Sequence, residues 1–153
     1  YGAILEDPTI DAVAICSSTD THAQIITAAA QAGKHIFCEK PIDHSLAKID
    51  AALSAVEKAG VQLMVGFNRR FDPSFRRVKG LVEEGQIGSA RILRITSRDP
   101  APPPISYIEV SGGLFLDMMI HDFDMARFVI GSEVEEVYTI SSEIKEGAVE
   151  EAA

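Results

Sequence analysis

Hydrophobic positions follow two different patterns along this chain, and the first pattern fills residues 1–67. Three short apolar runs lie at 11–16, 35–40 and 61–67, each bounded by polar residues. A short continuous apolar run of this kind is typical of a strand buried on both faces of a parallel sheet. We therefore predict three buried strands in this part of the chain.

Between these strands, apolar residues recur every three to four positions, as on one face of a helix. The expected inner faces consist of Ile25, Ile26, Ala29 and Ala30 in residues 21–34, and of Leu46, Ile49, Leu53 and Val56 in residues 45–60. Ser45 can cap the second helix, and Gly33 and Gly60 stand where the two helices would end. Strand, helix, strand, helix, strand with short connections predicts a parallel sheet with helices on its faces. Such sheets bind ligands outside the carboxyl ends of their strands.

After residue 67 the pattern changes. Asp72 followed by Pro73 predicts the start of a helix over 72–88 with an inner face of Phe75, Val78 and Val82, and a second helix runs over 115–130 to Gly131. Apolar and charged residues alternate over 90–98 and 133–144, which predicts strands with one solvated face. The prolines of 99–104 (Pro100, Pro102, Pro103 and Pro104) indicate an extended loop. We place the domain boundary at the change of pattern after residue 67, with domains at 1–68 and 69–153.

Composition limits the classes of function. The chain has 153 residues, 46% of them hydrophobic, which suits a folded protein with a core. Its formal net charge of −9 disfavours nucleic acid as a partner. No apolar run approaches the roughly 20 residues that span a bilayer, so we expect a cytoplasmic protein. Cys16 and Cys38 have no metal-binding spacing, and we expect both to be buried, reduced strand residues.

Polar residues gather where two of the expected strands end. Lys40 follows Glu39 at the end of the second strand, and Pro41 holds Lys40 in an extended conformation. Ser17, Thr19 and His22 follow the first strand. These side chains can meet a ligand at this edge; alternatively, Lys40 pairs with Glu39 at the surface and the hydroxyls only cap a helix.

The expected helix over 115–130 carries three aspartates, a histidine and an arginine among apolar residues. Asp117 and His121 are four residues apart and would point the same way. They can bind one small molecule, although a core histidine is the simpler interpretation of His121. Asp122 and Asp124 can cap or pair. Asp117, His121 and Asp124 could also hold a metal ion in a hydrolase, but the sequence offers no second histidine cluster as a source of ligands.

Three segments together resemble the Gfo/Idh/MocA oxidoreductase family. They are DAVAICSSTDTHAQIITAAAQAGKHIFCEKPI (11–42), GFNRRFDPSF (66–75) and GGLFLDMMIHDFD (112–124). The resemblance implies an α/β fold: the C-terminal part of a Rossmann-type parallel sheet, followed by the start of a second α/β domain with an open sheet. It also implies NAD or NADP as cofactor, a cyclic polyol or sugar as substrate, with myo-inositol first, and a homo-oligomer, often a tetramer.

The resemblance also assigns site residues. It implies that Lys40, Asp117 and His121 are catalytic and that the peptide bond before Pro41 is cis. On the cofactor side it places Ser17, Thr19, His22, Glu39 and Lys40. Asn68 and Arg98 are weaker candidates for binding the polyol, together with Asp117 and His121, and no metal is implied.

The sequence departs from the family's pattern: it contains no GxGxxG turn for a pyrophosphate, and no strand that carries an acid about 20 residues beyond one. We therefore expect an internal piece of a longer dehydrogenase that is inactive by itself. In the implied reaction His121 takes the hydroxyl proton, Lys40 stabilises the alkoxide and Asp117 binds substrate hydroxyls. A non-catalytic regulator or assembly module of the same fold stays open as an alternative, as does the metal-dependent hydrolase.

Overall fold

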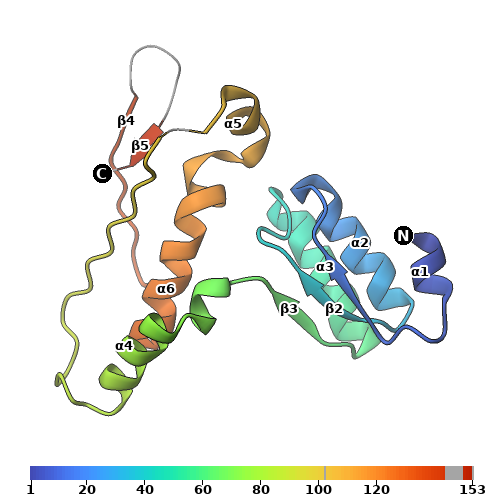
Figure 1. Cartoon of the computed structure of the whole chain (residues 1–153), viewed down its shortest axis with the longest axis horizontal. Coiled ribbons are helices and arrows are strands. Elements are labelled where there is room, and N and C mark those ends of the chain that lie inside the picture. Colours follow the sequence, from blue (N-terminus) through green and yellow to red (C-terminus); the bar gives the residue numbers. More distant parts are fainter. Residues whose placement is uncertain (102, 144–149, 153) are drawn as a thin grey trace. The chain divides into compact units, whose positions relative to one another are not determined.

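The chain folds into two compact units, residues 1–66 and residues 67–153. A computed structural model describes residues 1–101, 103–143 and 150–152, and each unit is an assembly of helices with a small sheet (Figure 1). Pro102 and Ile144, which belong to the expected loop and the last expected strand, lie outside the described residues.

The first unit is a parallel three-stranded sheet with crossover helices. After the short helix α1 (Gly2–Glu6), its elements are β1 (Ala12–Ile15), α2 (Thr19–Gln31), β2 (His35–Cys38), α3 (Leu46–Ala59) and β3 (Leu63–Val65). The strand order is β1-β2-β3, and both pairings are parallel. Ile15 pairs with Cys38, and Cys38 pairs with Val65, so the three carboxyl ends lie level. The predicted strands, helices and parallel pairing are therefore confirmed.

The expectation that these strands are buried on both faces is wrong for the residues described. Burial alternates along β1 and β2: Ile15, Ile36 and Cys38 are buried, whereas Ala14 and His35 are exposed. The order β1-β2-β3 with right-handed crossovers places α2 and α3 on the same face, where they pack against each other. The core of the unit is accordingly one-sided.

The predicted helix faces hold for α2 and only partly for α3. Ile26, Ala29 and Ala30 are almost fully buried in α2, as expected. In α3 the buried residues are Ala52 and Val56, while Leu46 is 77% exposed and Leu53 43% exposed. Ala52 and Val56 belong to the core cluster, whereas the larger leucines of α3 stay outside it. Gly60 ends α3 with φ 69°, a left-handed conformation that suits glycine.

The second unit is mainly helical. Its elements are the 3₁₀ helix η1 (Asn68–Phe71), α4 (Pro73–Glu83), α5 (Ile105–Ser111), the π-helical turn η2 (Phe115–Met119), α6 (Ile120–Ile130), β4 (Ser141–Glu143) and β5 (Glu150–Ala152). Asp72 caps α4 as predicted, because its carboxylate accepts hydrogen bonds from the backbone amides of Ser74 and Phe75 at 2.8 and 3.2 Å. The predicted helix ending at Gly131 is confirmed as η2 followed by α6.

The two strands expected in this unit are mostly absent from the part of the chain that is described. Residues 90–98 and 133–140 have no strand pairing, and only Ser141–Glu143 pairs, antiparallel, with β5. An alternating pattern specifies two faces, but a strand also needs a hydrogen-bonded neighbour, and the described residues provide none for 90–98.

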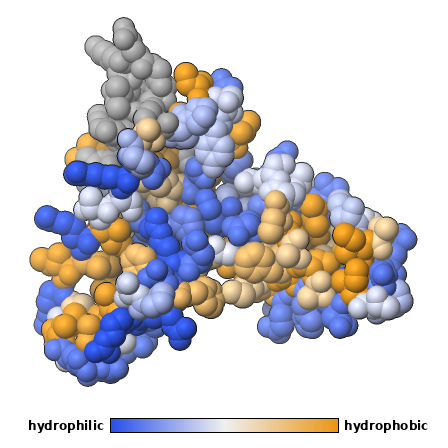
Figure 2. Space-filling model, in the orientation of Figure 1, coloured by the Kyte–Doolittle hydropathy of each residue, from blue (hydrophilic) through white to orange (hydrophobic). Residues whose placement is uncertain are grey.

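Phe75 and Val78 of the expected inner face of α4 are 36% and 45% exposed. Apolar side chains lie on the surface of both units (Figure 2).

Among the residues described, no helix is long and apolar enough to cross a membrane.

Candidate active site

The first unit gathers polar groups at the carboxyl edge of its sheet. The Glu39 amide donates a hydrogen bond to the Ile15 carbonyl at 2.9 Å, and the Gly66 amide donates to the Cys38 carbonyl at 2.8 Å. The backbone ladder therefore continues one residue beyond β2 and one residue beyond β3. A Cβ at Gly66 would lie only 3.0 Å from Glu39 Oε2. Glycine at this position leaves room for the Glu39 carboxylate against the end of β3.

His22 ties two of the strand-end loops together. Its ring is buried, with Nδ1 2.8 Å from the Pro41 carbonyl oxygen and Nε2 2.9 Å from the Ser17 carbonyl oxygen. The peptide bond between Lys40 and Pro41 is cis, as the family resemblance implied. The half-buried Lys40 thus sits on a segment that His22 fixes to α2. The structure gives His22 two backbone contacts rather than an exposed, ligand-facing ring.

The hydroxyls after β1 form a short chain of hydrogen bonds. Thr21 Oγ1 donates to the Ser18 carbonyl at 2.7 Å, and Ser17 Oγ lies 2.6 Å from Thr21 Oγ1. Because the single Thr21 hydroxyl proton is used on Ser18, Ser17 is the donor in its contact with Thr21. Ser17 Oγ keeps its acceptor capacity at an exposed position. Thr19 is half-buried and opens α2.

The prediction of a buried strand residue is confirmed for one cysteine, Cys38 of β2, and wrong for the other. Cys38 is buried, and burial first, followed by the nearby Glu39, raises the pKa of its thiol to about 12. Cys16 is exposed and lies just beyond β1, so the expectation of a buried strand residue is wrong for it. Both thiols are free. Cys38 is therefore an inert thiol beneath the carboxyl edge of the sheet.

In the second unit, Asp117 and His121 lie on consecutive helical elements. Asp117 is in the π turn η2, and His121 is in the first turn of α6. The Tyr107 hydroxyl donates to Asp117 Oδ1 at 2.9 Å. The ring of Phe67 meets the half-buried ring of His121 edge-on, with centroids 6.5 Å apart. A π turn places residues four apart at a different angle from an α-helix, and such turns occur frequently at functional sites.

Two arginines that were not among the predicted site residues hold helix α6 in place. Arg69 bonds to Asp122, which also accepts a hydrogen bond from Ser97 Oγ at 2.7 Å. Arg70 holds Asp124 with both Nε and Nη2, at distances from 2.6 to 3.0 Å. The pairing role expected for Asp122 and Asp124 is confirmed. The signal available in the sequence was opposite charge: two consecutive arginines lie in 66–75, and two aspartates lie in 121–124.

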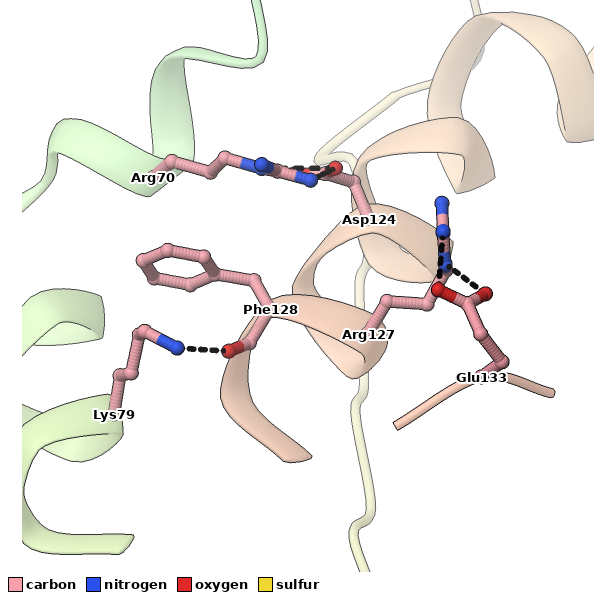
Figure 3. Close-up of polar contacts among 6 residues, drawn as sticks. All are labelled: Arg70, Lys79, Asp124, Arg127, Phe128 and Glu133. Atoms are coloured by element: carbon pink, nitrogen blue, oxygen red, sulfur yellow. Dashed lines mark hydrogen bonds and ion pairs between the residues drawn. The ribbon is translucent and has the colours of Figure 1, made fainter. Parts of the chain in front are cut away.

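Arg70 is the centre of a cluster at the junction of η1, α4 and α6 (Figure 3). Its guanidinium lies 5.8 Å from the Phe67 ring centroid and 5.5 Å from that of Phe128. Lys79 packs on the opposite side of Phe128, with its ammonium 4.7 Å from the ring centroid and 3.0 Å from the Phe128 carbonyl oxygen. The bond to Asp124 raises the pKa of Arg70 above its ordinary value. The cluster therefore anchors α6 to η1 and α4.

Replacing Arg70 with methionine should destabilise the second unit by about 2 kcal/mol, because Asp124 is buried and loses its charged partner. Arg127→Met is the matched control, since Arg127 makes the same two-nitrogen contact with Glu133 at an exposed surface. Urea denaturation of the two variants measures the difference. Equal loss of stability would mean that the Arg70 pair is no more than a surface contact.

Asn68 and Arg98 are exposed, Asn68 at the start of η1 and Arg98 in the unpaired segment before the proline-rich loop. Their role in substrate binding stays a prediction. Within the described ranges, no group of three or more His, Cys, Asp and Glu side chains could hold a metal ion. Asp124, one of the three ligands of the alternative hydrolase, is instead bound by Arg70.

Comparison with known proteins matches both parts of the chain. Residues 1–67 fit the model of an oxidoreductase family with an NAD-binding Rossmann fold, and residues 75–153 fit the GFO/IDH/MocA C-terminal domain. Myo-inositol 2-dehydrogenase of Thermotoga maritima is 58% identical over 91% of this chain and 42% of its own length. The chain spans about 40% of the length of the curated relatives that it matches.

Solved structures agree with this match. A putative myo-inositol dehydrogenase from Sinorhizobium meliloti superposes with a TM-score of 0.91 at 50% identity, covering 95% of this chain and 44% of that one. Scyllo-inositol dehydrogenase from Lactobacillus casei, solved with bound NAD(H) and scyllo-inositol, has a TM-score of 0.77 at 37% identity over 93% and 44% of the two chains. The Rossmann-like α/β fold is thereby established. The chain belongs to the GFO/IDH/MocA oxidoreductase family.

Proposed function

We propose that a longer protein containing these residues oxidises a secondary alcohol of a cyclic polyol, with myo-inositol as the first candidate, and passes the hydride to NAD. The observation that carries the proposal is the 58% identity to a myo-inositol 2-dehydrogenase across segments that include Lys40, Asp117 and His121. The related structure with NAD(H) and scyllo-inositol supports the same class of substrate and cofactor.

The chemistry of the side chains suits alcohol oxidation. The hydroxyl proton must leave as the carbon–hydrogen bond breaks, and an imidazole is a good acceptor near neutral pH, so His121 is our proposed base. Lys40 supplies positive charge for the developing alkoxide. Asp117 accepts hydrogen bonds from neighbouring hydroxyls of the polyol. A non-catalytic module would have no need of this combination of base, cation and carboxylate.

The carboxyl edge of the sheet fits one half of a dinucleotide. Ser17, Thr19 and Glu39 offer hydroxyl and carboxylate groups suited to ribose hydroxyls, and Gly66 leaves room beside Glu39. We propose that His22 acts on the cofactor through the loops that it holds. Bound NAD would supply the ring that accepts the hydride. No GxGxxG turn for the pyrophosphate occurs in the sequence.

We also propose domains 1–68 for the dinucleotide and 69–153 for substrate and oligomerisation, a cytoplasmic location and a homo-oligomer, with a tetramer as the first candidate. The free thiols of Cys16 and Cys38 suit a reducing compartment. Sizing chromatography with light scattering tests the oligomer.

We expect a longer protein that contains this sequence to reduce NAD in the presence of myo-inositol, measured as NADH absorbance. The 153-residue chain alone should not oxidise myo-inositol. By calorimetry it should bind NAD far more weakly than the longer protein, because it has no glycine-rich turn for the pyrophosphate. Activity with NADP alone would correct the cofactor. Activity that EDTA abolishes and zinc restores would favour the metal-dependent reaction over the proposal.

A further inference from the structure

Tyr107 lies ten residues before Asp117 in the sequence, and the backbone between them contains a turn at two glycines. Helix α5 ends at Ser111, and both Gly112 and Gly113 have positive φ values, of 85° and 81°. Ser111 Oγ accepts a hydrogen bond from the Gly113 amide and donates one to the Ile108 carbonyl, each at 3.2 Å. This turn therefore has its own internal bonds, and it connects α5 to the residues that lead into η2.

The turn brings the Tyr107 hydroxyl to Asp117 Oδ1, at 2.9 Å. An ionised carboxylate has only acceptor sites, so the phenol is the donor. Burial, followed by the bond to Asp117 and its negative charge, raises the pKa of Tyr107. The phenol thus keeps its proton throughout the neutral range and remains a hydrogen-bond donor to this carboxylate.

A hydrogen bond from a phenol can fix the orientation of an aspartate carboxylate. The terminal torsion of an aspartate is broad and roughly two-fold, so its carboxylate rotates easily unless it is bonded. Hydrogen bonds from a neutral donor to a charged group are among the stronger ones in proteins. We propose that Tyr107 is a positioning residue, which sets the orientation of the Asp117 carboxylate toward the polyol; this inference rests on the function proposed above.

In the longer protein, Tyr107→Phe should lower kcat/KM for myo-inositol roughly 10-fold, the loss expected for one hydrogen bond to a charged group. The KM for NAD should stay unchanged, because Tyr107 contacts Asp117 in the second unit and the proposed cofactor groups belong to the first. Tyr138→Phe is the matched control, since Tyr138 is 87% exposed, and it should leave kcat/KM for myo-inositol unchanged. An unchanged kcat/KM in Tyr107→Phe, or a loss that falls equally on the KM for NAD, would overturn the proposal.

A second measurement needs no activity. In the ultraviolet titration of the tyrosines, the Tyr107 phenol should ionise at higher pH than an ordinary tyrosine, because its pKa is raised. Asp117→Asn should shift that late titration to lower pH, and Tyr107→Phe should remove it. No late phenol, or one that ignores Asp117→Asn, would overturn the positioning role. If this titration behaves as expected but myo-inositol is not oxidised, the proposed function fails and the Tyr107–Asp117 bond stands.

Discussion

Replacing His121 with alanine should lower kcat about 10²–10⁴-fold in a longer protein that contains this sequence, the usual contribution of a positioned acid–base group. Cofactor affinity should change little, because His121 belongs to the second unit, and the proposed cofactor groups belong to the first. Stopped-flow NADH absorbance with myo-inositol gives kcat, and calorimetry gives the affinity for NAD.

Two controls separate a base from a packing residue. His35→Ala removes a histidine at the amino end of β2, where its Nδ1 accepts a bond from the Gln62 amide at 3.0 Å, and it should leave kcat unchanged. Free imidazole should restore part of the activity of His121→Ala, because it can enter the vacated position and take the proton. An undiminished kcat in His121→Ala would remove this residue from the mechanism.

Much of the first unit could be predicted because its signals are local. Periodic apolar residues and the glycines at 33 and 60 specify each helix and its end, and the alternation of strands and helices specifies parallel pairing. Which face of a strand is covered depends instead on strand order. This is why Ala14 is exposed although its neighbours in the sequence are apolar.

In the second unit, the missed features depend on partners distant in the chain. The alternation in 90–98 resembles a strand, but pairing needs a neighbour that the described residues do not offer. The spacing of Asp117 and His121 was visible in the sequence, whereas the π turn was not. The bonds from Arg70 to Asp124 and from Tyr107 to Asp117 join residues 54 and 10 positions apart, and no periodicity reports them.

The Lys40 ammonium can be tested against the interpretation that it is only a structural cation. Lys40→Met retains much of the apolar stem and deletes the charge. We expect folding to survive and kcat to fall about 10²–10³-fold, as on removal of one group that stabilises a developing oxyanion. Thermal denaturation and kinetics on the same preparation separate the two effects.

Lys34 provides the contrasting variant. Its ammonium is buried and donates hydrogen bonds to the Asp7 and Ile10 carbonyls at 2.8 and 2.7 Å, so Lys34→Met should lose stability by leaving those acceptors unsatisfied. Lys58, exposed in the last turn of α3, should tolerate the same change in both stability and rate. Lys40→Met should resemble Lys58→Met in stability and differ from it in rate. If it instead resembles Lys34→Met, with stability lost and the rate of the folded fraction retained, Lys40 is a structural cation and the alkoxide must be stabilised by another group.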